Sequence, residues 1–347
     1  MSGRVLPSAE IVALSREAGF DLCGFARAEP IPLEVLGEWM ASGMAADMDW
    51  MAARVAERID VRSLVPGART VISLACNYYV WDAELEDSPV SRYARGRDYH
   101  ATLKDRLRAL RRAFDGRWPG VRMYATVDTG PVMEKVWAVR AGLGYVGRNG
   151  CLITPRFGSW VFLATAVLEA EVDRYAEELV ADACGACSRC ISACPTDAIL
   201  PNRAVDARQC LSYQTIENSG RVPEELRPFF ENLVFGCDIC QAVCPLNATP
   251  VPVPGGGRFA PRPVTSLGVR ELAALTPEAY SELVPGTPLA RAGYDGLRRN
   301  AAYALGAMRD AGAEELLACL VQDPSEVVAD AARWALERIH DAPAGSP

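Results

Sequence analysis

The chain has 347 residues, half of them hydrophobic, and a formal net charge of −8 at pH 7. This length allows two or three domains of about 150 residues each. The acidic balance disfavours nonspecific binding to nucleic acid, although it leaves a local basic face open. Because no apolar run approaches the roughly 20 residues that span a bilayer, and the N-terminus lacks a signal peptide's apolar stretch, we expect a cytoplasmic protein without a membrane segment.

The first 170 or so residues alternate between helical and strand-like patterns. Helical periodicity is present in the segments 8–18, 33–51, 101–114 and 131–140. Short apolar runs typical of strands occur at 20–26, 70–78, 121–127 and 159–168. We place the end of a first domain at the last of these strands.

The start of the third helical segment contains Asp98, Tyr99 and His100. This run is close to the D-x-H-x-x-G motif with which some cobalamin proteins supply a histidine to cobalt. Position 103 is Leu instead of Gly, however, and no downstream elements match. The chain contains two histidines, and the other is His340 near its end. We therefore do not expect a histidine-ligated cobalt.

Three glycines, Gly142, Gly144 and Gly147, formally spell the dinucleotide fingerprint G-x-G-x-x-G. That fingerprint requires a strand before it and a helix after it. Here a helical pattern precedes the glycines and a turn-rich stretch follows them. We reject a Rossmann-type site and expect the glycines to let the backbone approach a flat or bulky ligand.

Eight of the twelve cysteines lie between Cys184 and Cys244. The first four follow the ferredoxin spacing C-x2-C-x2-C-x3-C-P, in which the fourth Cys ligates the other cluster. The last three repeat C-x2-C-x3-C-P. Zinc would favour two separated pairs of ligands, and disulfides are rare in the cytosol. The pattern therefore predicts two 4Fe–4S clusters. We assign cluster one to Cys184, Cys187, Cys190 and Cys244, and cluster two to Cys194, Cys210, Cys237 and Cys240.

The remainder of the chain is predicted to be helical around a linker. A helical insert is expected at 222–233, between the cysteine arcs, and residues 247–265 are rich in Pro and Gly. From 294 to 340 three helical patterns resemble one HEAT-type unit of about 40–47 residues. Such a unit cannot bury its own core and must pack on the preceding domain.

Taken together, these residues resemble the epoxyqueuosine reductase family, which completes the tRNA wobble nucleoside queuosine. The resemblance rests on four stretches: VDTGPVMEKVWAVRAGLGYVGRNG at 127–150, CLSYQTIE at 210–217, GCDICQAVCP at 236–245 and LRRNAAYALGAM at 297–308. It implies an α+β protein with four parts. These are a nitroreductase-like, cobalamin-binding catalytic α/β domain at 1–175, a ferredoxin-like double 4Fe–4S domain at 176–250, a linker at 251–290 and a HEAT-like, tRNA-binding helical domain at 291–347.

The resemblance also implies the reaction. The chain would reduce epoxyqueuosine to queuosine at position 34, in a tRNA anticodon stem-loop. It would use base-off cobalamin, the two clusters and an external low-potential electron donor. Asp128 would donate a proton to the developing alkoxide, which requires its pKa to rise above about 3.9. Taken alone, Asp128 fits equally well as an Asx turn or the N-cap of the following helix.

Further contacts follow from the resemblance residue by residue. The expected cobalamin contacts are Arg58, Asp128, Asn149, Ser159, Ser212 and Asp238. The expected tRNA contacts are Arg291, Arg298 and Arg299. Two interpretations of these arginines stay open: a solvent-exposed charged face of the helices, or contacts to tRNA phosphates. We expect a monomer, because one chain holds both clusters and the tRNA face.

Three other classes of protein remain open on sequence grounds. A reductive dehalogenase-like cobalamin enzyme would share the cofactors, but typically carries an export signal. A ferredoxin-like electron carrier docked through its helical repeat predicts clusters without cobalt. An RNA-binding adaptor with structural clusters predicts tRNA affinity that is independent of reductant.

Overall fold

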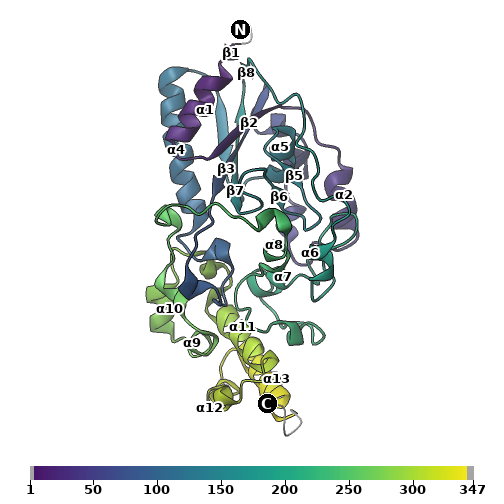
Figure 1. Ribbon diagram of the computed structural model, residues 1–347, viewed down its shortest axis with the longest axis vertical. Helices are drawn as coiled ribbons and strands as arrows, with labels where there is room; N and C mark the ends of the chain where they lie inside the picture. The colour runs from purple at the N-terminus through teal and green to yellow at the C-terminus, as the bar shows by residue number, and fades with distance from the viewer. Residues whose placement is uncertain (1–3, 342–347) are drawn as a thin grey trace.

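The computed structural model describes residues 4–341. Its α/β part lies at one end of the long axis and its helical part at the other, with the cysteine-rich segment (residues 184–244) between them (Figure 1). β1 and α13, the first and last elements described, lie toward opposite ends of this axis (Figure 1). Within residues 4–341, no helix combines the length and apolarity needed to cross a membrane.

A four-stranded sheet in the order β2-β3-β7-β4 is the centre of the α/β part, and neighbouring strands are antiparallel. Its strands are β2 (Leu22–Arg27), β3 (Thr70–Asn77), β4 (Met123–Thr126) and β7 (Val161–Leu168). Two small pairs accompany it: β1 (Val5–Leu6) with β8 (Glu171–Val172), and β5 (Tyr145–Val146) with β6 (Leu152–Ile153). All four predicted strands are therefore confirmed.

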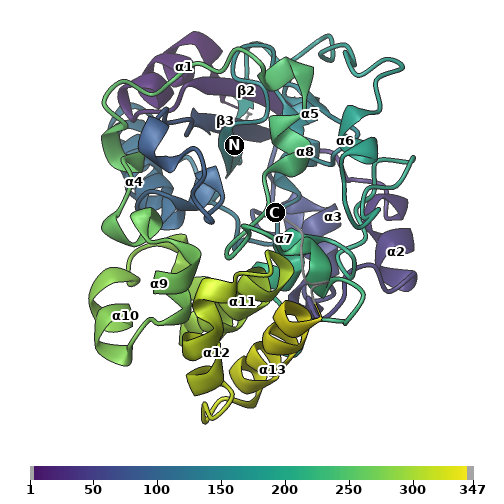
Figure 2. The same ribbon diagram turned by 60° about the horizontal axis from the view of Figure 1, so that its bottom comes forward.

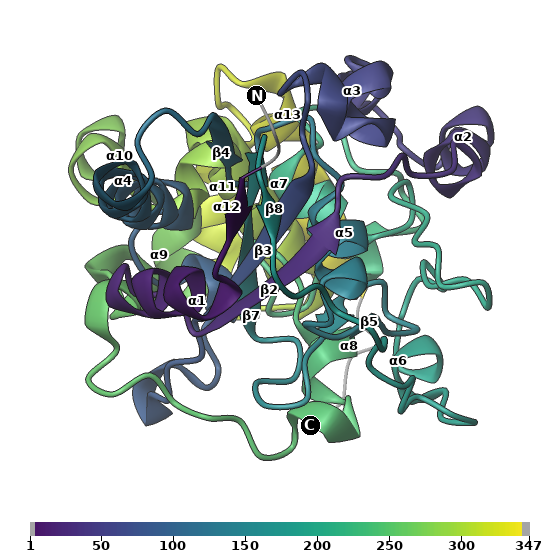
Figure 3. The same cartoon turned by 90° about the horizontal axis from the view of Figure 1, so that it is seen from above.

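Helices cover both faces of this sheet (Figure 3). The covering helices are α1 (Ser8–Glu17) and α4 (Tyr99–Arg117) on one face, and α5 (Glu134–Arg140) on the other. Because successive strand residues point to opposite faces, Ile72 packs in the core under α4 while Val71 packs with Trp137 of α5. β3 is consequently buried along its whole length.

The segment between β2 and β3 reaches over the cysteine-rich segment. It contains α2 (Glu34–Ala41) and α3 (Val55–Ile59). Trp39 Nε1 donates to the Val205 carbonyl at 2.8 Å. Tyr213 OH donates to Asp47 Oδ2 at 3.1 Å. These two hydrogen bonds thus fix the Met- and Trp-rich stretch to the cysteine-rich segment.

The cysteine-rich segment contains three short helices, α6 (Arg189–Ser192), α7 (Leu211–Ile216) and α8 (Ile239–Ala242). The helical insert expected at 222–233 is wrong, because the structure has only a 3₁₀ turn there, Arg227–Phe229. Pro223 and Pro228 explain the difference. Each lacks a backbone N–H and disfavours a helical residue before it.

Five helices follow: α9 (Val269–Ala273), α10 (Pro277–Leu283), α11 (Gly293–Ala307), α12 (Glu314–Leu320) and α13 (Glu326–His340). Figure 2 shows α11, α12 and α13 together, with α9 and α10 beside them. The expected linker at 251–290 is therefore corrected: it contains α9 and α10, and Leu272 of α9 is fully buried.

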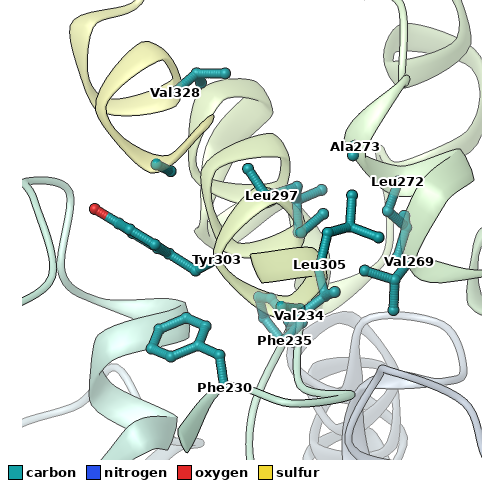
Figure 4. Close-up of a cluster of buried hydrophobic side chains, with 14 of the residues drawn as sticks. Phe230, Val234, Phe235, Val269, Leu272, Ala273, Leu297, Tyr303, Leu305 and Val328 are labelled. Carbon is teal, nitrogen blue, oxygen red and sulfur yellow. The ribbon is translucent and has the colours of Figure 1, made fainter. Parts of the chain in front are cut away.

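One hydrophobic core joins the cysteine-rich segment to the C-terminal helices (Figure 4). Phe230 and Phe235 pack there with Leu272 of α9 and with Leu297 and Tyr303 of α11. A stretch of the α/β part, residues 89–96, also enters this core. Its Val90 pairs with Phe235. The C-terminal helices thus complete a core that the preceding regions begin.

The glycines of the rejected fingerprint serve the chain's own packing. α5 precedes them and the β5–β6 hairpin follows, so the context is not that of a dinucleotide site. A Cβ at Gly144 would collide with the Ile153 carbonyl, and one at Gly147 with the Ile153 side chain. The expectation that these glycines let a ligand approach the backbone is therefore corrected, because the atoms close to Gly144 and Gly147 belong to Ile153 of the hairpin.

Candidate functional site

The structure brings together the four cysteines assigned to cluster one. Cys184, Cys187, Cys190 and Cys244 line one small cavity, whose wall also includes Asn149. α6 carries Cys190, and the turn after α8 carries Cys244. Residues 54 positions apart in sequence thus meet through the packing of two short helices.

The four cysteines assigned to cluster two are also near one another. Burial raises the pKa of the Cys237 thiol to about 12, and negative charge at Cys210 and Cys194 adds to the rise. Burial likewise raises the pKa of Cys240, with contributions from Cys237 and Cys210. Bound iron would reverse this effect, because a coordinating metal deprotonates thiols.

The donor set fits iron–sulfur clusters better than a single ion. Among residues 4–341, no three Cys, His, Asp or Glu side chains converge on one ion position. A tetrahedral zinc site would need such convergence. A 4Fe–4S cluster spreads four thiolates over its four irons. All eight assigned donors are cysteines, which suits this chemistry.

Asp128 lies in the loop after β4, in the left-handed region at φ 52°. Its backbone N–H donates to Glu134 Oε1 at 3.0 Å. The N-cap of α5 is Met133, so Asp128 does not cap that helix. Its side chain is 55% exposed. Non-glycine residues rarely adopt this backbone conformation, and such strain gathers at functional sites.

His100 joins Asp128 in a group that sequence reasoning missed. His100 Nε2 lies 2.8 Å from Asp128 Oδ2, and Nδ1 lies 2.8 Å from Asp98 Oδ1. Asp98 is itself fixed as the N-cap of α4. Both ring nitrogens therefore face carboxylates. We call Asp98, His100, Asp128 and Glu134 the His100 group. The Asp98-Tyr99-His100 run is the signal for this group in the sequence, where it resembles only a cobalt-binding motif.

Protonation within the His100 group differs from the expectation for a lone acid. Burial lowers the pKa of His100, but the hydrogen bonds to Asp128 and Asp98 outweigh burial and raise it to about 9. Protein packed around the half-exposed Asp128 side chain partly desolvates it and raises its pKa, but the hydrogen bond and charge of His100 hold the pKa below its usual range. The expected rise in the Asp128 pKa is therefore absent from this structure. Burial raises the pKa of Glu134 to about 8.

Three of the expected cobalamin contacts already have protein partners for their polar side-chain atoms. Asn149 Nδ2 donates to the Cys240 carbonyl at 3.4 Å, and Asn149 Oδ1 accepts the Cys151 N–H at 3.2 Å. Ser159 Oγ accepts from Gln241 Nε2 at 2.9 Å. These two residues tie the α/β part to α8.

Asp238 is the third. Its Oδ1 accepts from Ser91 Oγ and its Oδ2 from the Arg92 N–H, each at 2.7 Å. The carboxylate thus secures the 89–96 stretch beside α8. Arg58 and Ser212 are placed differently. Both are half-buried, on α3 and α7 respectively, and Arg58 Nη2 donates to the Trp50 carbonyl at 3.1 Å.

The three arginines expected to contact tRNA have different environments. Arg291 is 56% exposed, pairs with Glu217 at 2.6 Å and lies 5.1 Å above the Trp50 ring. Its charge also acts on Asp128. It therefore lies near the His100 group, at the boundary of three regions of the chain.

Arg298 and Arg299 require a correction, because both are buried. Arg298 pairs with Asp323. Arg299 donates to the Asn218 carbonyl at 2.7 Å and to the Gln214 carbonyl at 2.9 Å. Their guanidinium groups hold α11 in place and do not form a surface patch. Helical periodicity had placed them near one end of the unit without showing which face is covered.

Comparison with known proteins agrees with this arrangement. A family model described as "4Fe-4S double cluster binding domain" matches residues 183–247. A second, described as "Epoxyqueuosine reductase QueG, DUF1730", matches residues 58–129. The epoxyqueuosine reductase of Gloeobacter violaceus is 41% identical over 322 residues, which cover 88% of this chain and 98% of that protein.

Solved structures match over nearly the whole chain. A crystal structure of epoxyqueuosine reductase with an epoxyqueuosine-modified tRNA-Tyr stem loop has a TM-score of 0.88 and 28% identity, covering 96% of this chain and 90% of that one. The Bacillus subtilis enzyme, with its catalytic loop swung out of the active site, has a TM-score of 0.84 and 26% identity, with the same coverage of each chain.

The double 4Fe–4S domain joined to an antiparallel sheet with helices on both faces defines an iron–sulfur protein, and its reductase relatives make it an oxidoreductase. Identity and coverage then fix the family, since a 41% identical relative is matched over almost its full length. The chain belongs to the epoxyqueuosine reductase family.

Proposed function

We propose that this chain reduces epoxyqueuosine to queuosine at position 34 of tRNA. The observation that carries the proposal is the match to the stem-loop complex, which extends over 96% of the chain and so includes every region described above. The alternative function, a ferredoxin-like electron carrier, is less well supported because it gives no role to the α/β part, which contains the His100 group.

The proposed reaction takes two electrons and two protons. Both carbon–oxygen bonds of the epoxide break, the carbon–carbon double bond forms, and the oxygen leaves as water. The two sets of four cysteines would hold two clusters, which would supply the electrons of an external low-potential donor. Cobalamin, which the residues named below would hold, would supply the reactivity toward carbon that iron–sulfur clusters alone lack.

The residues nearest the site divide into two roles with respect to cobalamin. Asp128, Arg58 and Ser212 remain at least partly accessible and would contact it directly. Asn149, Ser159 and Asp238 are held by the protein, so they would shape the wall of the site and offer backbone or already bonded atoms. The donor set therefore fits the cofactor with three direct contacts instead of the six expected.

The parts of the chain then receive proposed roles. Residues 1–175 form a nitroreductase-like catalytic domain, residues 176–250 relay electrons, and the HEAT-like helices at 291–347 support the tRNA. Arg291 is the remaining candidate for a phosphate contact, because it is exposed and near Asp128. A cytoplasmic monomer fits these roles.

The function is tested with purified, anaerobically reconstituted protein, cobalamin, a chemical reductant and tRNA carrying epoxyqueuosine. Mass spectrometry of the digested nucleosides should show queuosine. Asp128→Asn should keep iron content and cobalamin absorbance but lower turnover by about 10²–10⁴-fold, the range for a lost acid. Unchanged turnover would reject the role of Asp128, and a wild-type protein that leaves the epoxide intact would reject the reductase function.

A further inference from the structure

The reaction demands more protons than one carboxyl group holds. Two protons are consumed per epoxide, and Asp128 carries one at most. An ionised Asp128 carries none, and its pKa lies below the usual range because His100 outweighs the effect of burial. A protonated group within hydrogen-bonding distance of Asp128 would supply the proton that the ionised carboxylate lacks.

His100 is placed to be that protonated group. Its Nε2 lies 2.8 Å from Asp128 Oδ2, a distance typical of a strong hydrogen bond. The opposite ring nitrogen lies 2.8 Å from Asp98 Oδ1. Asp98 cannot swing freely, because the same oxygen accepts the His100 backbone N–H at 2.9 Å. The Tyr99 ring stacks on the imidazole at 4.1 Å between centroids, which fixes the plane of the ring.

The two hydrogen-bonded carboxylates, Asp98 and Asp128, are the groups that favour a cation on His100. Besides the two hydrogen-bonded carboxylates, the titratable or charged groups that face the group from the neighbouring elements are Tyr99 and Lys104 of α4, Glu134 of α5 and Arg291 before α11. Glu134 also accepts the Asp128 N–H and so holds the loop against His100.

We propose that His100 holds the proton that Asp128 delivers, and that Asp98 and Glu134 keep His100 and Asp128 within hydrogen-bonding distance of each other. This inference rests on the proposed function. The proton moves from His100 Nε2 to Asp128 Oδ2, and Asp128 then passes it to the oxygen leaving the substrate. The imidazole, 25% exposed, regains a proton from solvent for the second transfer. His100 acts through Asp128 and is thus a positioning residue.

The first test reads the proton directly and needs no substrate. The chain has two histidines, so a sample with ¹⁵N-labelled histidine gives two imidazole signals to titrate by NMR. His100→Gln assigns them. His100 should titrate near 9. Asp98→Asn should move the His100 midpoint downward. A His100 midpoint near the ordinary histidine value of about 6.5 would overturn the proposal.

The second test is the pH profile of turnover. In the wild type the rate should fall as pH rises through about 9, where the pair loses its shared proton. In His100→Gln the proton resides on Asp128 alone, so the rate should fall above about pH 4–5 and be lowered about 100-fold or more at pH 7.5. In Asp98→Asn the fall in rate should begin at a lower pH than in the wild type.

His340→Gln is the matched control, because it removes the other imidazole far from the site. It should leave the pH profile unchanged. Cluster absorbance reports whether each variant has folded. A His100→Gln profile that superimposes on that of the wild type would overturn the proposal. If the wild type does not convert the substrate, the proposed function fails, while the titration still decides whether His100 holds the proton.

Discussion

The cysteine-rich segment and the His100 group are both needed for the proposed reaction, but they are encoded differently. Seven of the eight cysteines lie in two runs of fixed short spacing, and the helices α6 and α8 within these runs carry Cys190 and Cys240. The His100 group draws its members from the start of α4, the loop after β4 and α5. Local spacing specifies metal ligands, whereas the protonation of a catalytic acid depends on neighbours that only the fold supplies.

The largest expected effect lies in the cysteine-rich segment. Cys240→Ala should remove a ligand of cluster two and lower the iron content from about eight to about four per chain. Reductase activity should fall to background, because the relay needs both clusters. Iron analysis and turnover check this. Cys319→Ala is the control, since Cys319 is exposed on α12 and should retain all the iron. Retention of full iron by Cys240→Ala would break the assignment.

An intermediate effect should separate two arginines that look alike in sequence. Arg299→Ala leaves buried carbonyls of residues 214–220 without their donor and should lower the free energy of unfolding by about 3 kcal/mol. Arg291→Ala removes an exposed ion pair and should cost about 0.5 kcal/mol or less. Denaturant unfolding measures both.

Arg291→Ala should instead weaken tRNA binding, most clearly at low salt. Equal stability losses in the two variants would contradict the division into a buried anchor and an exposed contact. Unaltered tRNA affinity would remove Arg291 from the proposed interface.

The smallest expected effect concerns Glu134. With a pKa raised from 4.5 to about 8 by burial, Glu134 is mostly neutral at pH 7. Glu134→Gln keeps the acceptor for the Asp128 N–H and should change turnover at pH 7 by less than about threefold, or under ~0.7 kcal/mol.

The same variant has a signature in stability. From pH 4.5 to 8 the folded protein retains a proton on Glu134 that the unfolded chain releases, so stability falls as pH rises through this window. Glu134→Gln should lose that part of the slope. Thermal unfolding at several pH values measures it, and an unchanged slope would contradict a neutral Glu134.

The sequence predicts some parts of the fold correctly and others not. The strands, α1, α4 and the double-cluster domain could be predicted because period and spacing are local properties. Residues 251–290 could not, because short helices such as α9 have little periodicity and gain their stability from the shared core. The insert at 222–233 misled because its apolar residues fit a helix while its prolines prevent one.

The candidate site shows the same limit at the level of single residues. Asp128 was identified, but its partner His100 lies 28 residues earlier, and only the fold brings them within hydrogen-bonding distance. Arg298 and Arg299 were assigned to the surface because a helical pattern alone does not show what packs against each face. Neighbours in three dimensions determine both protonation and exposure.

The pairing of residues 89–96 with the cysteine-rich segment has a consequence for synthesis of the chain. Ser91 and its partner Asp238 are 147 positions apart. At ribosomal rates of 5–20 residues per second, the early stretch waits on the order of 10 s for its partner. The α/β part therefore cannot finish folding while its own residues emerge, and its final closure is timed with the arrival of the cysteines that bind iron.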